Sequence, residues 1–131
     1  MTRIDEYIVS PAEILSIGPY ILVEIAGELG PALLDTGASF SVIDITTAQD
    51  LQLEEDKEPH HVVGATGGGM YPRFLTDLYI PVLGFTIDSP MPSLPLMEND
   101  HPWVAIIGRD VICQYEFTVN GQTGLIRFAS A

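Results

Sequence analysis

Short runs of apolar and β-branched residues, separated by turn-forming residues, recur along the whole chain. The run at 20–26 precedes Gly-Glu-Leu-Gly and the apolar Ala32-Leu33-Leu34, a pattern that predicts a hairpin. Runs at 117–119 and 125–128 flank a turn and predict a second, closing hairpin. Further strands are expected at 40–43, 61–63, 70–75, in two pieces at 78–87, and at 104–107. The pattern favours an all-β protein.

Two segments predict short helices, and one predicts an irregular loop. Asp44 is a suitable N-cap for a helix that runs through about Leu51. The segment 109–116 is expected to form one or two helical turns. Four prolines lie between 89 and 102, and we expect them to prevent regular structure there.

Length and composition indicate a single domain, 1–131. The 131 residues suit one hydrophobic core, and 47% of them are hydrophobic. Pro (10) and Gly (12) are spread along the chain, which fits frequent turns between strands. No internal repeat or linker interrupts the pattern.

The charge balance argues against several partners. Five basic and 18 acidic residues give a formal net charge of -13, so nucleic acid and anionic membrane surfaces should repel the chain. No apolar run approaches the ~18 residues of a membrane span, and the N-terminal segment lacks a signal-peptide pattern. A soluble, cytoplasmic protein is the expectation.

Cysteine and histidine offer little chemistry. Cys113 is the single cysteine, which excludes an intrachain disulfide and favours a buried small hydrophobe. The three histidines, His60, His61 and His101, match no metal-ligand spacing and are expected at the surface. No metal or cofactor is predicted.

The strongest candidate for chemistry is Asp35, which follows a buried apolar strand in the sequence Ala-Leu-Leu-Asp-Thr-Gly-Ala-Ser. Gly37 permits a tight turn directly after the acid, and Thr36 can hydrogen-bond the neighbouring backbone. An Asp-Thr-Gly triplet alone is more often a structural Asx-turn than a catalytic site. A second motif, Ile106-Ile107-Gly108-Arg109-Asp110, lies further along the chain.

With both motifs and a glycine-rich segment between them, the chain resembles the retropepsins, the aspartic proteases of retroviruses and their cellular relatives. The resemblance covers roughly residues 20 to 128. It implies a single-lobed, closed β-barrel of the acid-protease type with one or two short helices. It also implies an aspartic endopeptidase that acts on peptides or proteins.

Carried over from the family, Asp35 is the catalytic residue, and Thr36 and Gly37 brace it. The resemblance gives Ala38 and Ser39 to substrate binding, and Ile107, Gly108, Arg109 and Asp110 to structural support. Ser41 stands where the family usually has Thr, and it is expected to hydrogen-bond Asp110. The family usually carries an acid at the position of Ser39, which pairs with the Arg that matches Arg109. Here Arg109 needs another partner, either Asp44 or an acid of a second subunit.

The chemistry of this family requires two carboxylates that share one proton, because like charges ~3 Å apart do not both ionise. The chain has a single Asp-Thr-Gly element and is too short for two lobes. A homodimer with one Asp35 from each subunit follows if the protein is a protease.

The glycine-rich segment predicts a flap over bound peptide, formed by Gly64, Ala65, Thr66, Gly67, Gly68 and Gly69. A phosphate-binding loop would need Gly-Lys-Ser/Thr after it, which is absent. A plain flexible hairpin remains open. Thr-Gly-Ala-Ser also opens the cofactor loop of short-chain dehydrogenases, but the strand-like residues that follow argue against that fold.

Two further alternatives stay open. Trp103 either lines a substrate pocket or packs in the core. The protein is either an active protease or a retropepsin-fold dimer that binds or scaffolds peptides with little turnover. The intact Asp-Thr-Gly triplet favours the first.

Overall fold

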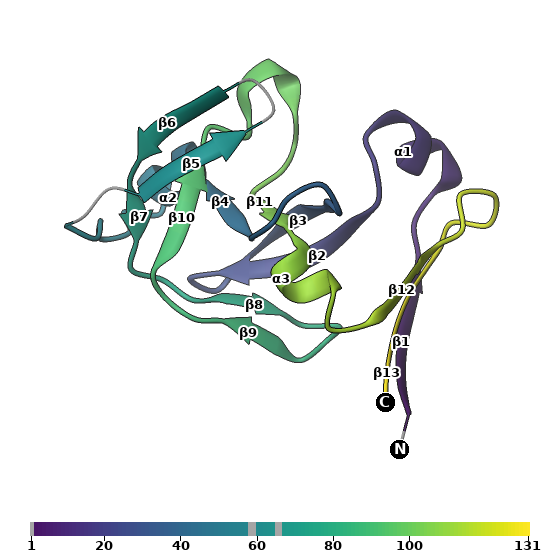
Figure 1. Cartoon of the computed structure of the whole chain (residues 1–131). Helices are drawn as coiled ribbons and strands as arrows, with labels where there is room; N and C mark the ends of the chain where they lie inside the picture. The colour runs from purple at the N-terminus through teal and green to yellow at the C-terminus, as the bar shows by residue number, and fades with distance from the viewer. Residues whose placement is uncertain (1, 58–59, 65–66) are drawn as a thin grey trace.

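The computed structural model describes residues 2–57, 60–64 and 67–131 (Figure 1). In this part of the chain an eight-stranded sheet has the order β7-β10-β4-β11-β3-β2-β8-β9. Its strands are β2 (Tyr20–Ile25), β3 (Glu28–Leu34), β4 (Val42–Asp44), β7 (Arg73–Phe74), β8 (Leu78–Ile80), β9 (Phe85–Ile87), β10 (Met91–Leu94) and β11 (Ala105–Ile107). The sheet curls into a half-barrel that ends at β7 and β9 without joining them, so the all-β prediction holds and the barrel is open.

Two smaller sheets complete the fold. Strands β1 (Arg3–Ile8), β13 (Leu125–Ser130) and β12 (Glu116–Val119) form the terminal sheet, and β5 (His60–Gly64) and β6 (Gly67–Tyr71) form a hairpin. The described helices are all short: α1 (Pro11–Ser16), α2 (Ile45–Asp50), α3 (Arg109–Ile112) and the 3-10 turn η1 (Glu98–Asp100). Among the described residues, no helix is long and apolar enough to cross a membrane.

The apolar residues of the strands build one core. Every second residue of β2 is buried (Ile21, Val23 and Ile25), because side chains alternate between the two faces of a strand. Buried residues of β3, β8, β11 and β13 pack in the same cluster. The core therefore fixes the two strands, β3 and β11, that lead into the two sequence motifs.

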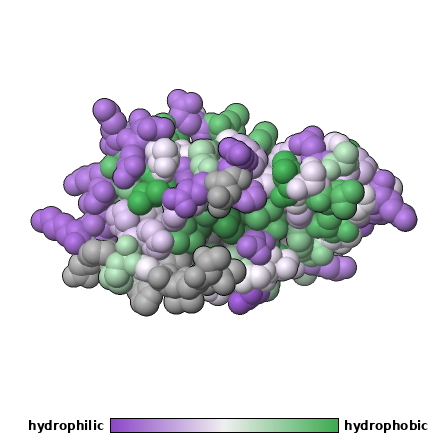
Figure 2. Space-filling view, turned by 90° about the horizontal axis from the view of Figure 1, so that it is seen from above, coloured by the Kyte–Doolittle hydropathy of each residue, from purple (hydrophilic) through white to green (hydrophobic). Residues whose placement is uncertain are grey.

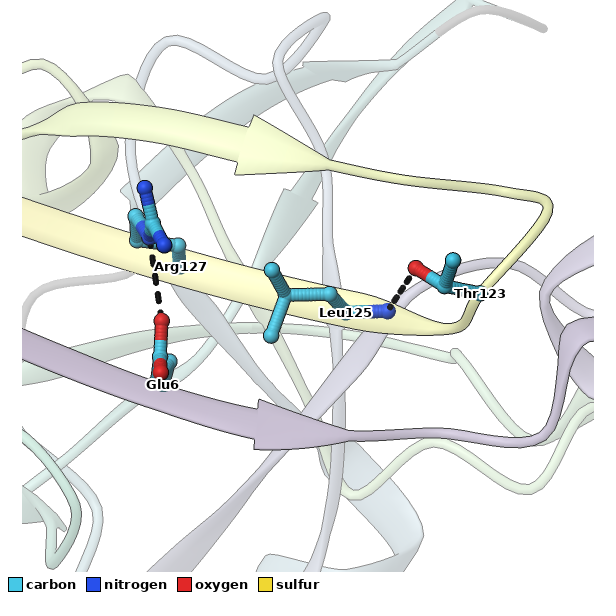
Figure 3. Close-up of polar contacts among 4 residues, drawn as sticks. All are labelled: Glu6, Thr123, Leu125 and Arg127. Atoms are coloured by element: carbon cyan, nitrogen blue, oxygen red, sulfur yellow. Dashed lines mark hydrogen bonds and ion pairs between the residues drawn. The ribbon is translucent and has the colours of Figure 1, made fainter.

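The terminal sheet joins the two ends of the chain. Strand β1 pairs with β13 along its whole length, from Arg3 opposite Ser130 to Ile8 opposite Leu125. Glu6 and Arg127 form an ion pair of 3.0 Å across these strands, and the Leu125 amide donates to the Thr123 hydroxyl at the adjoining turn (Figure 3). The sheet projects from the half-barrel beside α1 (Figure 1).

The prediction that 89–102 lacks regular structure was wrong. Strand β10 lies within it and pairs in parallel with β4 and antiparallel with β7. The buried Ser93 hydroxyl donates to the Pro72 carbonyl at 2.5 Å, which ties β10 to the chain ahead of β7. Prolines in this segment remove some donors, but a short strand between two neighbours needs few of them.

Asp44 explains how the segment after β10 is held. It is fully buried, and one carboxylate oxygen caps α2 by accepting from the Thr47 amide and hydroxyl at 2.8 Å. The other oxygen accepts from the amides of Leu96 and Met97 at 3.0 and 3.1 Å. The predicted N-cap is present, and it also anchors the loop that leads to β11.

Candidate active site

Asp35 follows β3 at the centre of the half-barrel. Strand β3 lies between β2 and β11, and Ala32 and Leu34 point into the core. The Asp35 amide donates to the Ile107 carbonyl at 2.9 Å, which continues the parallel pairing of β3 with β11. The acid is therefore fixed by its backbone to the strand of the second motif.

A tight turn directs the Asp35 carboxylate. The carboxylate oxygen Oδ1 accepts from the Gly37 amide at 2.8 Å, and the backbone carbonyl of Asp35 accepts from the Ala38 amide at 3.2 Å. A Cβ at Gly37 would lie 3.1 Å from Oδ1, so a side chain there would crowd the carboxylate. Thr36, Gly37 and Ser39 are exposed, which leaves the outer side of the loop open.

Thr36 braces the loop in a different way from the one predicted. Its hydroxyl makes no hydrogen bond to any described residue, but its carbonyl accepts from Arg109 Nη1 at 2.7 Å. Arg109 also donates its backbone amide to the Ala38 carbonyl at 2.8 Å. Of the two partners considered for Arg109, Asp44 is excluded, because it is buried and its carboxylate is occupied by α2 and the amides of Leu96 and Met97. An acid of a second subunit stays a prediction.

Gly108 lets the two motifs approach each other closely. Strand β11 lies between β3 and β4, and Gly108 follows it directly. A Cβ at this glycine would meet the Ala38 carbonyl oxygen at 2.8 Å and the backbone of Phe40 at 2.8–2.9 Å. Any side chain would collide with the main chain of the Asp35 loop.

The hydrogen bond expected between Ser41 and Asp110 is present. The buried Ser41 hydroxyl donates to Asp110 Oδ1 at 2.8 Å, and the Ser41 amide donates to Oδ2 at 3.0 Å. The Ser41 hydroxyl also accepts from the Gly108 amide at 3.0 Å. These bonds, together with the Arg109 contacts, hold the Asp35 loop against the second motif at several points.

The glycine-rich segment is a β-hairpin where it is described. Strands β5 and β6 pair from His60 opposite Tyr71 to Gly64 opposite Gly67. Ala65 and Thr66, predicted at its tip, lie outside the described residues. Both strands contact β10, and the hairpin stands above that strand in Figure 1.

Two secondary predictions have outcomes, for Trp103 and Cys113. Trp103 is 4% exposed and packs against Tyr20 with ring centroids 5.9 Å apart, so it belongs to the interior and has little surface for a pocket wall. Cys113 is exposed, so its expected burial was wrong; it follows the short helix α3 on the side away from the core. No group of three potential metal ligands occurs among the described residues.

Asp35 thus follows the central strand β3 on a glycine turn and is bonded to the Ile-Ile-Gly strand β11 within one curled β-lobe. A family model described as aspartyl protease matches residues 21–78, which include the Asp35 loop. The EIAV protease, solved with the inhibitor HBY-793, has a TM-score of 0.56 and 24% identity over 72% of this chain and 85% of its own.

A retropepsin-like aspartic protease from Rickettsia conorii has a TM-score of 0.55 and 15% identity, and the match covers 99% of this chain and 94% of its own. None of the curated sequences compared with the chain matches it. The chain therefore resembles the retropepsin-like aspartic proteases in its fold and in the segment that contains Asp35.

Proposed function

We propose that the protein is an aspartic endopeptidase that works as a homodimer, with one Asp35 from each subunit. The observation that carries this proposal is the position of Asp35 on an exposed, rigidly held loop that has a single carboxylate. Hydrogen bonds from Arg109 and the Gly37 amide hold the loop, and Thr36, Gly37 and Ser39 on its outer side are exposed and available to face a second copy.

In this mechanism the two carboxylates hold one proton between them. The ionised carboxylate takes a proton from water, and the water oxygen attacks the scissile carbonyl carbon. The protonated carboxyl donates a hydrogen bond to the carbonyl oxygen, which gains negative charge. Collapse of the tetrahedral intermediate breaks the C–N bond as a proton passes to the leaving nitrogen. No metal or cofactor takes part.

The β5–β6 hairpin is proposed as the flap. Its paired glycines allow the backbone to approach an extended substrate closely and to donate and accept main-chain hydrogen bonds. Ala38 and Ser39, on the loop after the catalytic turn, are proposed to contact the substrate from the opposite side.

Substitution of Asp35 tests the activity. Asp35→Asn keeps the side-chain volume and removes the shared proton, so cleavage of a peptide library should fall to background. Asp50→Asn, an exposed aspartate on α2, is the matched control and should cleave normally. If Asp35→Asn still cleaves, Asp35 is not the catalytic acid. If it loses cleavage in vitro yet retains its cellular role, the peptide-scaffold alternative is favoured.

A mixing experiment tests the dimer separately. When subunits exchange, excess Asp35→Asn protein should capture wild-type subunits in mixed dimers that have only one competent carboxylate. Activity per wild-type chain should then fall steadily as the mutant is added. Activity that stays constant would show that each chain works alone.

A further inference from the structure

An apolar cleft lies between the terminal sheet and the half-barrel. It has a volume of about 690 Å³ and is lined by residues of β1, β2, the start of β3 and the turn after β8. Three of its apolar residues are largely exposed: Ile8 (66%), Leu29 (63%) and Leu22 (51%). Hydrophilic residues cover much of the face seen in Figure 2, with apolar residues gathered toward the end that has α1 and the terminal sheet in Figure 1.

At this cleft, the backbone N–H and C=O of Leu22 in β2 have no partner strand in the part of the chain that the structure describes. The Leu34 amide donates to the Pro19 carbonyl, so Pro19, and with it Ile21 and Val23, direct their backbone groups toward β3. The intervening residues, Tyr20 and Leu22, direct theirs away from β3. The Tyr20 carbonyl accordingly accepts from the Tyr7 hydroxyl at 2.6 Å.

Strand β8 does not cover the next position. It pairs with β2 at Glu24 and Ile25 only, and the residue that would stand opposite Leu22 is Pro81, which has no N–H. The chain then turns away at 81–84. The Leu22 N–H and C=O therefore have no strand partner among the described residues, and they lie at the wall of the cleft.

The cleft also contains one carboxylate without a cation. Glu24 lines it and forms no ion pair within the described part of the chain. The four arginines are engaged elsewhere: Arg3 with Asp5, Arg73 with Asp56, Arg127 with Glu6, and Arg109 with the Thr36 carbonyl. Lys57, the remaining basic residue, does not line the cleft, and the formal net charge is -13. A cation from another molecule would therefore complement Glu24.

We propose that this cleft binds an extended polypeptide segment of a partner protein, which pairs with β2 at Leu22, beyond the end of β8, and from which a Lys or Arg side chain reaches Glu24. One residue of the segment exchanges both backbone hydrogen bonds with Leu22, as in strand addition. Its apolar side chains rest on Tyr7, Leu29 and Val82. The long aliphatic stem of a Lys or Arg suits the same apolar wall, while its charge reaches the carboxylate.

A labelled heptapeptide is the probe. The sequence Thr-Val-Thr-Lys-Thr-Val-Thr, blocked at both ends, places valine, lysine and valine on one face of a strand, as Leu22 and Glu24 require. One control peptide has Glu in place of Lys. Another has N-methyl groups on the lysine and both valine nitrogens, which removes the backbone donors that would face β2. Fluorescence anisotropy with the Asp35→Asn protein measures binding without cleavage, so the result does not depend on the proposed catalytic activity.

The unmodified peptide should bind, and both control peptides should bind about tenfold more weakly or worse. Glu24→Lys should weaken binding of the unmodified peptide by about tenfold or more, and Glu24→Gln should weaken it by less. Glu54→Lys, which makes the same charge change at an exposed residue outside the cleft, should stay within about twofold of the parent protein. Thermal unfolding of each variant confirms that the fold is intact.

Several outcomes would overturn the proposal. Absence of binding by the unmodified peptide at millimolar concentration excludes the site. Equal binding of the N-methylated peptide excludes strand addition, and equal weakening by Glu54→Lys excludes Glu24 as the recognising acid. If Glu24→Lys or Leu22→Thr converts a dimer to a monomer without peptide in sedimentation, a second copy of the chain covers the cleft instead.

Discussion

The Arg109 guanidinium donates a 2.7 Å hydrogen bond from Nη1 to the carbonyl of Thr36, the residue directly after the candidate catalytic aspartate. The charged group thus acts on the loop through its backbone and forms no ion pair with an acid among the described residues. Because the Arg109 amide also binds the Ala38 carbonyl, the arginine spans the turn that contains Gly37.

Arg109→Met tests this contact, since it keeps the aliphatic stem and removes the donor. We expect kcat to fall by about ten- to a hundredfold, because a small displacement of the acid misplaces the reacting groups, with KM changing less. The free energy of unfolding should fall by only ~1 kcal/mol, as the bond lies at the surface. Arg127→Met, which removes an exposed arginine in the terminal sheet, should leave kcat unchanged. Equal losses of kcat in both variants would contradict a positioning role for Arg109.

Gly108→Ala should destabilise the protein by about 1–3 kcal/mol, because the added methyl group collides with backbone atoms of Ala38 and Phe40 that do not move independently. Gly121→Ala is the matched control: a Cβ there meets nothing within 4 Å, and its effect should stay within ~0.5 kcal/mol. Urea unfolding monitored by circular dichroism compares the two. Similar stabilities for both variants would show that the two motifs do not pack as closely as described.

The glycines of the hairpin are predicted to set the rate of turnover. Replacing Gly67 and Gly68 with Val should slow cleavage, because β-branched residues stiffen a backbone that has to move and admit substrate. The melting temperature should change little, as the β5–β6 hairpin forms its own small sheet. Steady-state kinetics with a cleaved peptide measure the first effect. Unchanged kcat and KM would argue that the hairpin is not a flap.

Stability should decrease at alkaline pH because of Tyr7. Burial, followed by the neighbouring Tyr20, raises the pKa of the Tyr7 phenol well above its ordinary value. The unfolded chain releases this proton near the ordinary pKa of ~10 while the folded chain keeps it, so the free energy of unfolding is constant below that pH and falls above it.

Tyr7→Phe should lower stability by about 1 kcal/mol near pH 7, because it removes the hydrogen bond to the Tyr20 carbonyl. The same variant should lose less stability than the wild type between about pH 9 and about pH 11, since the titrating group is gone. Urea unfolding across this range measures both effects, with Tyr79→Phe at an exposed position as the control. A parallel loss in wild type and Tyr7→Phe would assign the alkaline effect to other groups.

Charge should control self-association. Two copies of a chain with a net charge of -13 repel each other at neutral pH and low salt. Protonation of some carboxylates relieves the repulsion, and the proposed dyad itself needs a proton, so both association and activity should rise from pH 7 toward roughly pH 4 to 6. Added salt should partly restore the dimer at neutral pH. Sedimentation at pH ~7 and ~5, with and without salt, decides the matter; a dimer equally tight in all four conditions would leave only the dyad to set the pH optimum.

Local sequence patterns were sufficient for much of the fold. The hairpin at 20–34, the Asp44-capped helix and the closing hairpin at 116–130 were expected because period-2 burial, capping and turn chemistry act over a few neighbours. Strand β10 was missed because prolines argue against regular structure locally, whereas its pairing with β4 depends on distant residues. Strand β1 and α1 were not anticipated either, since their polar, exposed pattern has weak periodicity.

Some contacts around the candidate site were predictable from the sequence, and others were not. Ser41 and Asp110 meet as expected because both lie beside a glycine that fixes how closely the backbones approach. The partner of Arg109 could not be derived, because it is a backbone carbonyl and every residue has one whatever its side chain. The unpaired backbone of Leu22 depends on where β8 ends. In the sequence, Pro81 is the one residue that indicates this end.

The pairing of β1 with β13 brings Arg3 and Ser130 opposite each other, so the chain enters and leaves its fold at one place. A protein built this way can be inserted into a surface loop of a host protein with little separation imposed on the host's own chain. The same closeness makes it a candidate for circular permutation, in which a short linker joins the chain near Arg3 to the chain near Ser130 and new ends are opened at the exposed turn around Gly121. Such a permutant would keep every residue of the Asp35 loop at its place in an uninterrupted stretch of chain.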